Sequence, residues 1–281
     1  MEQYLKSVLT KYLEIRDQIK HEKPQEWLQV IELCKKVPKS IDRQALWMSG
    51  RDKPCWSNIT VAGGARIAQD LAMSTDFSSF EIIAGDSWKI VKTGKGRGNS
   101  NFEFIGEVAE RFLKSLNRGG LSSYQWKLFS IRELALALNG GGDKIESLIN
   151  TLVSKNILSL EEIEPWTKAF AKCAGFGWGY ITANHMVADL GVSIKPDIHV
   201  RRSGVRLGMA GDTSPHLTDK EIDDLPGKVD FEIVRTAIQL PKLIEPIALE
   251  GATGAFKNKI ALREMDKVLM EWSRQGLSKP V

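Results

Sequence analysis

Residues 175–202 constrain the fold of this chain most, because a glycine-rich turn, an apolar helix and a second helix start follow one another there. Gly177 and Gly179 stand just before the first helical pattern. Glycine lets backbone N–H groups approach a phosphate, and the positive end of the following helix favours an anion at that place. Asp197 then precedes a second helical pattern at 198–207, where aspartate is a favoured N-cap.

These residues resemble the helix-hairpin-helix DNA glycosylases. The hairpin pattern of that superfamily, Gly-x-Gly-x-Lys-Thr-Ala-Asn, matches residues 177–184, and its pattern x-Asp-x-His-Val-x-Arg matches residues 196–202. The match departs at Ile181, which takes the place of the lysine that forms a Schiff base in lyase-active members. The resemblance therefore implies a monofunctional glycosylase, in which water attacks the sugar and the abasic strand stays intact.

The resemblance implies that Asp197 is the catalytic carboxylate. Excision of a base flipped out of the duplex builds positive charge on the sugar, which a carboxylate can stabilise while it orients the attacking water. A simpler interpretation makes Asp197 only a helix N-cap and the glycine turn only a tight turn between packed helices. Arg201 lies four residues after Asp197 and can pair with it or reach a phosphate. The residues expected to contact DNA are Gly175, Gly177, Trp178, Gly179, Thr182, Arg201 and Arg202.

Aromatic residues are candidates for the pocket that would receive a flipped base. The chain has eight tryptophans, most of which we expect in the core. Trp47 and Trp56 flank a polar loop and are our candidates for base contact, whereas Trp178 stands between two glycines of the turn and can contact the DNA backbone. We expect His199 to pack or to form a hydrogen bond rather than to act as a catalyst.

Composition and charge are compatible with a nucleic-acid partner and indicate no resident metal. The formal net charge of +4 is mildly basic, which suits a polyanionic partner but also many other enzymes. The three cysteines are far apart and none follows Cys173, so we expect no zinc site and no iron–sulfur cluster of the kind some superfamily members hold after the aspartate. The histidines show no ligand spacing. We expect no required cofactor, although the resemblance implies that carbonyl groups of the hairpin loop can bind a monovalent cation.

We expect an intracellular protein, for example in the cytoplasm of a bacterium or a phage-infected cell, and a monomer. No apolar stretch reaches the length of a membrane span, and the charged start of the chain lacks the apolar core of a signal peptide.

Helical periodicity dominates the chain, so an all-α fold is expected. Helices are predicted at about 2–20, 25–36, 65–73, 105–116, 130–138, 143–155, 159–173, 182–191, 198–207, 219–225, 231–240 and 257–274. Ser130 and Glu133 have the spacing of a capping box. Short apolar runs at 76–102 can be strands or helix fragments, and the loop at 92–101, rich in glycine, lysine and arginine, can be a DNA contact or a solvated linker.

By the resemblance, we expect two lobes with a DNA cleft between them. The predicted parts are an N-terminal lobe at 1–79, a helical barrel with the hairpin at 80–192, and C-terminal helices at 193–281 that complete the second lobe and carry Asp197. The expected function is excision of a damaged or modified base from double-stranded DNA, including hypermodified phage bases, which would make the protein a defence enzyme rather than a repair enzyme. The first alternative is a DNA-binding protein without catalysis, and the second is a helical protein whose hairpin packs against a partner subunit. The sequence does not indicate which base is removed.

Overall fold

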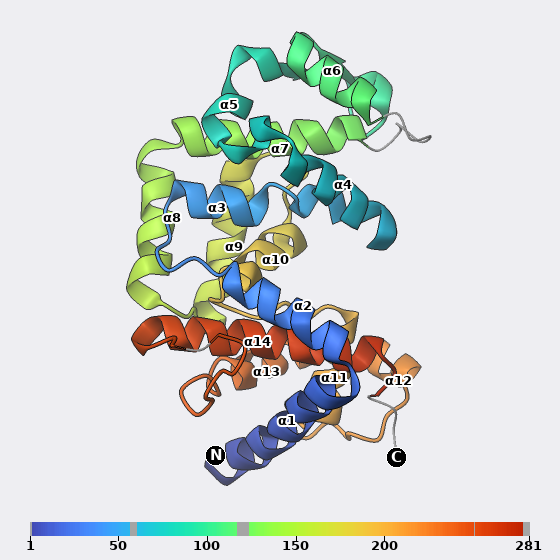
Figure 1. The fold of residues 1–281 in the computed structure, drawn as a ribbon, viewed down its shortest axis with the longest axis vertical. Coiled ribbons are helices and arrows are strands. Elements are labelled where there is room, and N and C mark those ends of the chain that lie inside the picture. Colours follow the sequence, from blue (N-terminus) through green and yellow to red (C-terminus); the bar gives the residue numbers. More distant parts are fainter. Residues whose placement is uncertain (1, 57–60, 117–123, 250, 278–281) are drawn as a thin grey trace. The chain divides into compact units, whose positions relative to one another are not determined.

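The computed structural model describes residues 2–56, 61–116, 124–249 and 251–277. The described residues are mostly helical, which confirms the all-α class (Figure 1). The chain divides into two compact units: unit 1 holds Met1–Lys39, Ser154–Ile163 and Val187–Val281, and unit 2 holds Ser40–Val153 and Glu164–Met186. None of the described helices is long and apolar enough to cross a membrane.

The division differs from the boundaries expected after residues 79 and 192. The first two helices of the chain group with its C-terminal part, while residues 40–79 group with the middle of the chain. The chain passes from one unit to the other between Lys39 and Ser40, and again within each of the three helices α8 (Gly142–Lys155), α9 (Leu160–Ala174) and α10 (Tyr180–Asp189). Periodicity along a sequence shows that a helix has an apolar face but not which helix will cover that face, so this grouping cannot be derived from the helical pattern.

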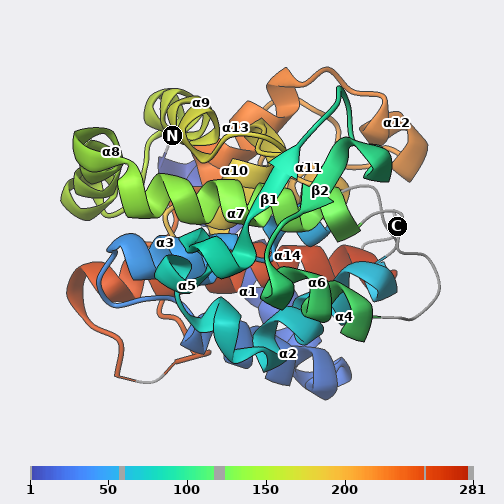
Figure 2. The ribbon, with the colours of Figure 1, turned by 90° about the horizontal axis from the view of Figure 1, so that it is seen from above.

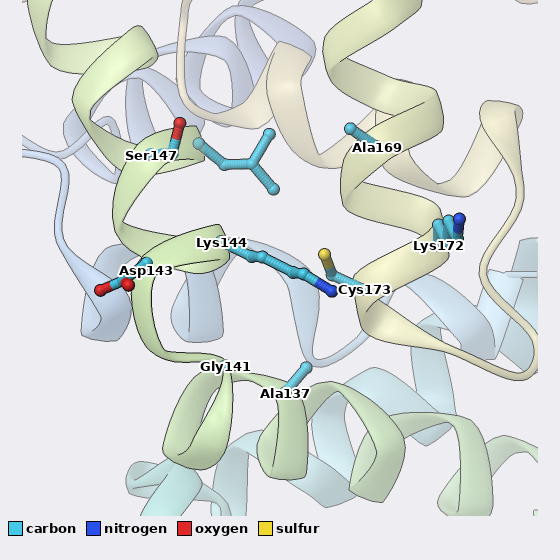
Figure 3. A pocket seen from close by; sticks show the side chains of 9 residues that line it. Ala137, Gly141, Asp143, Lys144, Ser147, Ala169, Lys172 and Cys173 are labelled. Carbon is cyan, nitrogen blue, oxygen red and sulfur yellow. The ribbon is translucent and has the colours of Figure 1, made fainter.

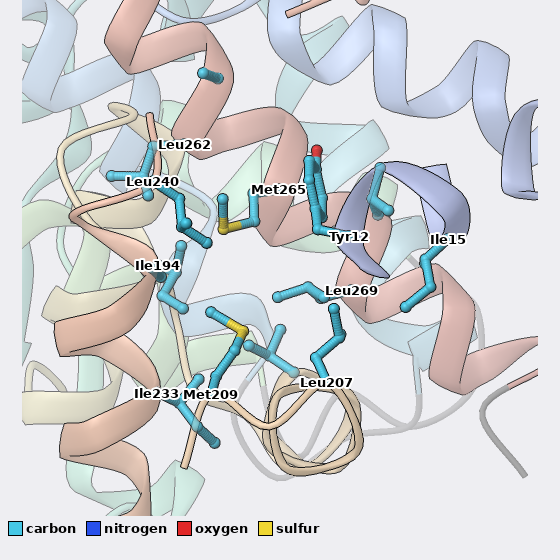
Figure 4. Close-up of a cluster of buried hydrophobic side chains, with 14 of the residues drawn as sticks. Tyr12, Ile15, Ile194, Leu207, Met209, Ile233, Leu240, Leu262, Met265 and Leu269 are labelled. Atoms are coloured by element: carbon cyan, nitrogen blue, oxygen red, sulfur yellow. The ribbon is translucent and has the colours of Figure 1, made fainter. Parts of the chain in front are cut away.

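Unit 1 is built around one long central helix. Its helices are α1 (Glu2–Glu22), α2 (Pro24–Lys35), α11 (Ile198–Arg206), α12 (Asp219–Asp223), α13 (Lys228–Ala237) and α14 (Gly254–Arg274). α14 packs against α1, α2 and α11 and is buried from Lys259 to Leu269. Figure 4 shows Met265 and Leu269 of α14 among Tyr12 of α1 and Leu207 at the end of α11.

Because α14 is covered on all sides, its polar residues need partners inside the protein. Glu264 is fully buried and accepts hydrogen bonds from the N–H groups of Ile247 (2.9 Å) and Ala248 (2.8 Å) and from Arg16 Nη1 (3.2 Å). Burial raises the pKa of the Glu264 carboxyl, and the Ala248 N–H and the Arg16 guanidinium oppose that shift. These bonds attach the chain around residue 247 and helix α1 to α14.

Unit 2 contains the remaining elements, and its helix α7 (Tyr124–Gly140) packs against several of them. They are α3 (Arg43–Gly50), α4 (Val61–Met73), α5 (Phe80–Ala84), α6 (Glu107–Ser115), the 3-10 helices η1 (Lys53–Trp56), η2 (Thr75–Ser78), η3 (Asp86–Trp88) and η4 (Asn99–Asn101), and the strands β1 (Ile90–Lys92) and β2 (Phe102–Phe104). The strands are antiparallel, with Ile90 opposite Phe104 and Lys92 opposite Phe102. Figure 2 shows both strands beside α7, against which they pack.

The capping box expected at Ser130 is wrong. α7 begins at Tyr124, so Ser130 lies inside the helix, where its hydroxyl donates to the Trp126 carbonyl at 2.8 Å. Glu133 accepts a hydrogen bond from the backbone N–H of Phe176 instead, and burial raises the pKa of its carboxyl. Both residues therefore face the glycine turn, a role that their spacing along the chain does not reveal.

Candidate functional site

The glycine turn joins α9 to α10 within unit 2. After α9 ends at Ala174, Gly175 and Gly177 adopt left-handed backbone angles, with φ of 79° and 82°. The Trp178 N–H bonds to the Gly175 carbonyl at 3.2 Å, and the Gly179 carbonyl accepts the N–H of Ala183 at 3.0 Å as α10 starts. The sequence thus forms a tight turn followed at once by a helix.

The glycines of the turn are required for different reasons. A Cβ atom on Gly177 would stand 2.6 Å from Cβ of Ser130 and closer still to its hydroxyl, and one on Gly175 would meet the Glu133 carboxylate at 2.7 Å. Gly179 is exposed and a Cβ there would meet nothing within 4 Å. Gly177 is therefore a packing position against α7, while Gly179 belongs to the open surface of the turn.

The side chains beside these glycines do not all lie as expected. Trp178 is only 7% exposed, and its Nε1–H donates to the Ser130 carbonyl at 3.0 Å. Its ring is a core group packed edge-on against Phe170, so the expectation that it contacts DNA is wrong. Thr182 is half-buried in the first turn of α10, and Ile181 is 72% exposed.

Asp197 caps α11 in unit 1. Its Oδ1 accepts the N–H groups of His199 at 3.0 Å and Val200 at 3.1 Å, which is the N-cap geometry expected from the sequence. Its Oδ2 lies 3.7 Å from Lys195 Nζ, and the Asp197 side chain is 26% exposed. The carboxylate is thus held by one oxygen while part of its surface remains accessible.

The segment that carries Asp197 is anchored to the central helix of its unit. The Lys195 N–H donates to Oδ1 of Asp266 at 3.0 Å, and Asp266 also pairs with Arg263 at 3.2 Å and Lys267 at 3.1 Å. Arg263 reaches Asp189, at the end of α10, at 2.6 Å. Buried charges on α14 therefore hold both ends of the connection between α10 and α11.

His199 follows Asp197 by two residues and contacts Ser273 near the end of α14. Its Nδ1 lies 3.3 Å from Ser273 Oγ, in agreement with the expected hydrogen-bonding role. Burial lowers the pKa of the His199 imidazole, while neighbouring Asp197 opposes the shift and Arg274 adds to it. The ring is therefore biased toward its neutral form in the folded protein.

The two arginines of α11 are already paired within unit 1. Arg201 lies 3.5 Å from Asp230 and donates to the Pro226 carbonyl at 3.2 Å, so the expected pair with Asp197 is not formed. Arg202 binds Asp223 through two nitrogens, with Nε to Oδ1 at 2.9 Å. Their charges are neutralised by carboxylates far along the chain, and their role as phosphate contacts stays a prediction.

The two candidate pocket tryptophans differ in exposure. Trp47 is fully buried in unit 2 and donates from Nε1 to the Phe77 carbonyl at 3.0 Å, so it is a core residue and the expectation of a base contact is wrong. Trp56 is half-buried, and its Nε1–H bonds to Asp52 Oδ2 at 3.2 Å. Its ring fills the space beside Gly64.

An open pocket of about 670 Å³, which the sequence pattern does not predict, lies between the end of α7, α8 and α9 in unit 2. Its lining residues are Ala137, Gly141, Asp143, Lys144, Ser147, Leu148, Ala169, Lys172 and Cys173. Figure 3 shows Lys144 of α8 and Cys173 of α9 among the residues that line it. Because these residues come from three separate helices, no local sequence motif predicts the pocket. Within the described ranges, no cluster of histidine, cysteine and carboxylate side chains could hold a metal ion.

No protein-family model matches this chain, and neither a curated protein nor a solved structure is significantly similar to it.

Proposed function

We propose that this chain is a monofunctional DNA glycosylase that hydrolyses the N-glycosidic bond of a modified base, with Asp197 as the catalytic carboxylate. The observation that carries the proposal is the setting of Asp197, which combines a fixed position with an accessible side chain. Two backbone N–H groups hold its Oδ1, and the side chain keeps 26% of its surface exposed. The proposal extends to the two-lobed fold of the helix-hairpin-helix superfamily and to a monomer acting on double-stranded DNA.

The chemistry assigned to Asp197 is the stabilisation of positive charge on the sugar. When the base leaves with the electron pair of the bond between C1′ and nitrogen, C1′ becomes electron-deficient, and a nearby carboxylate lowers the energy of that state. The oxygen of a water molecule then bonds to C1′, and its proton passes to the carboxylate. The hydrogen bond from the Lys195 N–H to Asp266 supports this role, because it limits movement of the segment that carries Asp197.

The glycine turn is assigned to the DNA backbone. The first N–H groups of a helix lack acceptors within the helix, and the helix dipole favours an anion near them. Gly179 is exposed at the start of α10 with open space around its Cα, which leaves room for a phosphate. This assignment requires no metal or cluster, although carbonyl groups of the turn could also hold a monovalent cation.

The test is base release from duplexes that each carry one modified base, detected as strand cleavage after heating in alkali. We expect Asp197→Asn to lower the single-turnover rate by about 100-fold or more, with DNA affinity changed only a few-fold, because asparagine keeps the cap but loses the charge. Asp42→Asn is the matched control. Asp42 also caps a helix, accepting the Ala45 N–H at 2.7 Å, so its replacement should leave the rate unchanged.

The outcomes separate the proposal from its first alternative. Binding of duplex DNA without release from any modified duplex would favour a DNA-binding protein without catalysis. Near wild-type rates for Asp197→Asn would refute the assignment of the carboxylate. Absence of any DNA affinity at low salt would favour a hairpin that packs against a partner subunit.

A further inference from the structure

The loop at 92–101 is a closed turn at the tip of the β1–β2 hairpin. The Thr93 N–H donates to the Asn101 carbonyl at 2.8 Å, and the Asn101 side-chain amide donates to the Lys95 carbonyl at 2.6 Å. The Lys92 amine donates to the Gly94 carbonyl at 2.6 Å. These internal bonds fix the loop to its own strands, so the interpretation as a solvated linker does not describe it.

The loop lies against the glycine turn through contacts between cations and aromatic rings. Lys92 Nζ stands 5.0 Å from the ring centre of Phe176, the residue between Gly175 and Gly177. The Arg97 guanidinium stands 4.6 Å from the ring centre of Trp126. That same tryptophan borders Gly177, since a Cβ there would be 3.5 Å from its ring.

A cluster of phenylalanine rings joins the hairpin, α7 and the turn. Phe102 of β2 lies 5.3 Å from Phe129 of α7 and 5.7 Å from Phe176 of the turn, measured between ring centres. Phe129 and Phe176 are 5.5 Å apart. The basic loop and the glycine turn therefore form one continuous part of unit 2, although about 80 residues of sequence separate them.

The positive charge of this loop is available, in contrast to that of α11. Lys95 and Arg97 are exposed, and neither pairs with a carboxylate in the part of the chain that the structure describes. Stacking on Trp126 orients the Arg97 guanidinium and leaves its edge N–H groups for an anion. Lysine and arginine at such positions neutralise phosphates.

We infer that the 92–101 loop and the 175–179 turn form one surface that binds the sugar-phosphate backbone of duplex DNA, with Lys95 and Arg97 as phosphate contacts. Trp126 is 4% and Phe129 8% exposed, so these rings are not free to stack on unpaired bases, as the aromatics of single-strand binders are. The surface therefore suits a duplex. The inference rests on the proposed function only for the identity of the partner.

The experiment measures binding of the full chain to an unmodified duplex by fluorescence anisotropy at several salt concentrations. We expect Lys95→Ala/Arg97→Ala to raise Kd about tenfold and to reduce the slope of log Kd against log salt by about 2, since each phosphate contact contributes about 0.9. Arg97→Lys should preserve most of the slope. Lys144→Ala/Lys172→Ala is the matched control, because it removes the same charge from the α8–α9 pocket of the same unit.

The inference is overturned if the two double variants weaken binding equally, if neither changes the slope, or if the wild-type chain does not bind the duplex at low salt. If the wild-type chain binds single-stranded DNA more tightly than the duplex, and Lys95→Ala/Arg97→Ala abolishes that binding, the assignment of a duplex partner is wrong. Because the duplex carries no modified base, a slope change without base release would support this surface while the proposed glycosylase fails. Base release together with an unchanged slope in the loop variant would support the proposed glycosylase and refute this surface.

Discussion

Replacing Gly177 by alanine tests why the turn between α9 and α10 needs glycine. Gly177 has φ of 82°, and a Cβ there would stand 2.6 Å from Cβ of Ser130 on α7. Gly179, two residues later, has open space around its Cα. We therefore expect Gly177→Ala to destabilise unit 2 and Gly179→Ala to change stability little.

The magnitude follows from two terms. A left-handed backbone costs a residue with a Cβ about 1–2 kcal/mol, and overpacking of a well-filled site costs about 1–3 kcal/mol. Their sum, about 2–5 kcal/mol, corresponds to a fall in Tm of roughly 5–15 °C for a protein of this size class. Gly179→Ala should stay within about 0.5 kcal/mol of wild type, as surface substitutions usually do.

The assay is thermal and urea unfolding followed by tryptophan fluorescence. Six of the eight tryptophans belong to unit 2, so the signal reports mainly on the unit that contains the turn. Adding Ser130→Ala to Gly177→Ala removes the hydroxyl that the new methyl group would meet, and a double-mutant cycle should show that the second change relieves part of the loss.

Equal unfolding midpoints for Gly177→Ala and Gly179→Ala would refute this reasoning. If the unfolding free energy of the double variant equals the value expected from adding the two single effects, the strain does not arise at Ser130. If the expectation holds, loss of DNA affinity in Gly177→Ala reports on folding, whereas Gly179→Ala is the substitution that probes the surface of the turn.

Three further predictions concern chemistry and titration. Borohydride should trap no covalent adduct between the protein and DNA during base release. An adduct that forms as fast as the base is released, and that is lost in Lys195→Gln, would contradict water attack. It would identify the attacking group as the Lys195 amine, which lies 3.7 Å from Asp197 Oδ2. Burial lowers the pKa of His199 in the folded protein. The neutral imidazole therefore contributes folding stability above about pH 6.5, the pKa of histidine in the unfolded chain. This stability is lost as the pH falls through the lower pKa of the folded state. His199→Gln should therefore lose less unfolding free energy than wild type between pH 7.5 and about pH 5, measured by urea titration; equal losses would contradict the assignment. Burial raises the pKa of Cys34 to about 12 and also raises that of Cys55, so a thiol reagent at pH 8 should label only the half-buried Cys173 in the folded chain and all three cysteines after denaturation.

Local features of the sequence predicted the long helices, the glycine turn after α9 and the N-cap of α11. The long helices expected at about 2–20, 143–155 and 257–274 are α1, α8 and α14 within a few residues. The N-cap at Asp197 was also predictable, because a cap depends on a side chain and the backbone two or three residues later. The catalytic role of Asp197 remains a prediction.

Only the tertiary structure decided which groups meet across long stretches of chain. From the sequence, Arg201 and Arg202 are candidates for phosphate contacts. In the structure Asp230 and Asp223, each more than 20 residues away, neutralise their charges. By sequence, the loop that contains Arg97 can be a DNA contact or a linker, and only its contact with Trp126 places it beside the glycine turn. Local spacing determines helix periodicity and caps, since those interactions span a few residues. Burial and ion pairing depend on which helix faces pack together, which no short segment encodes.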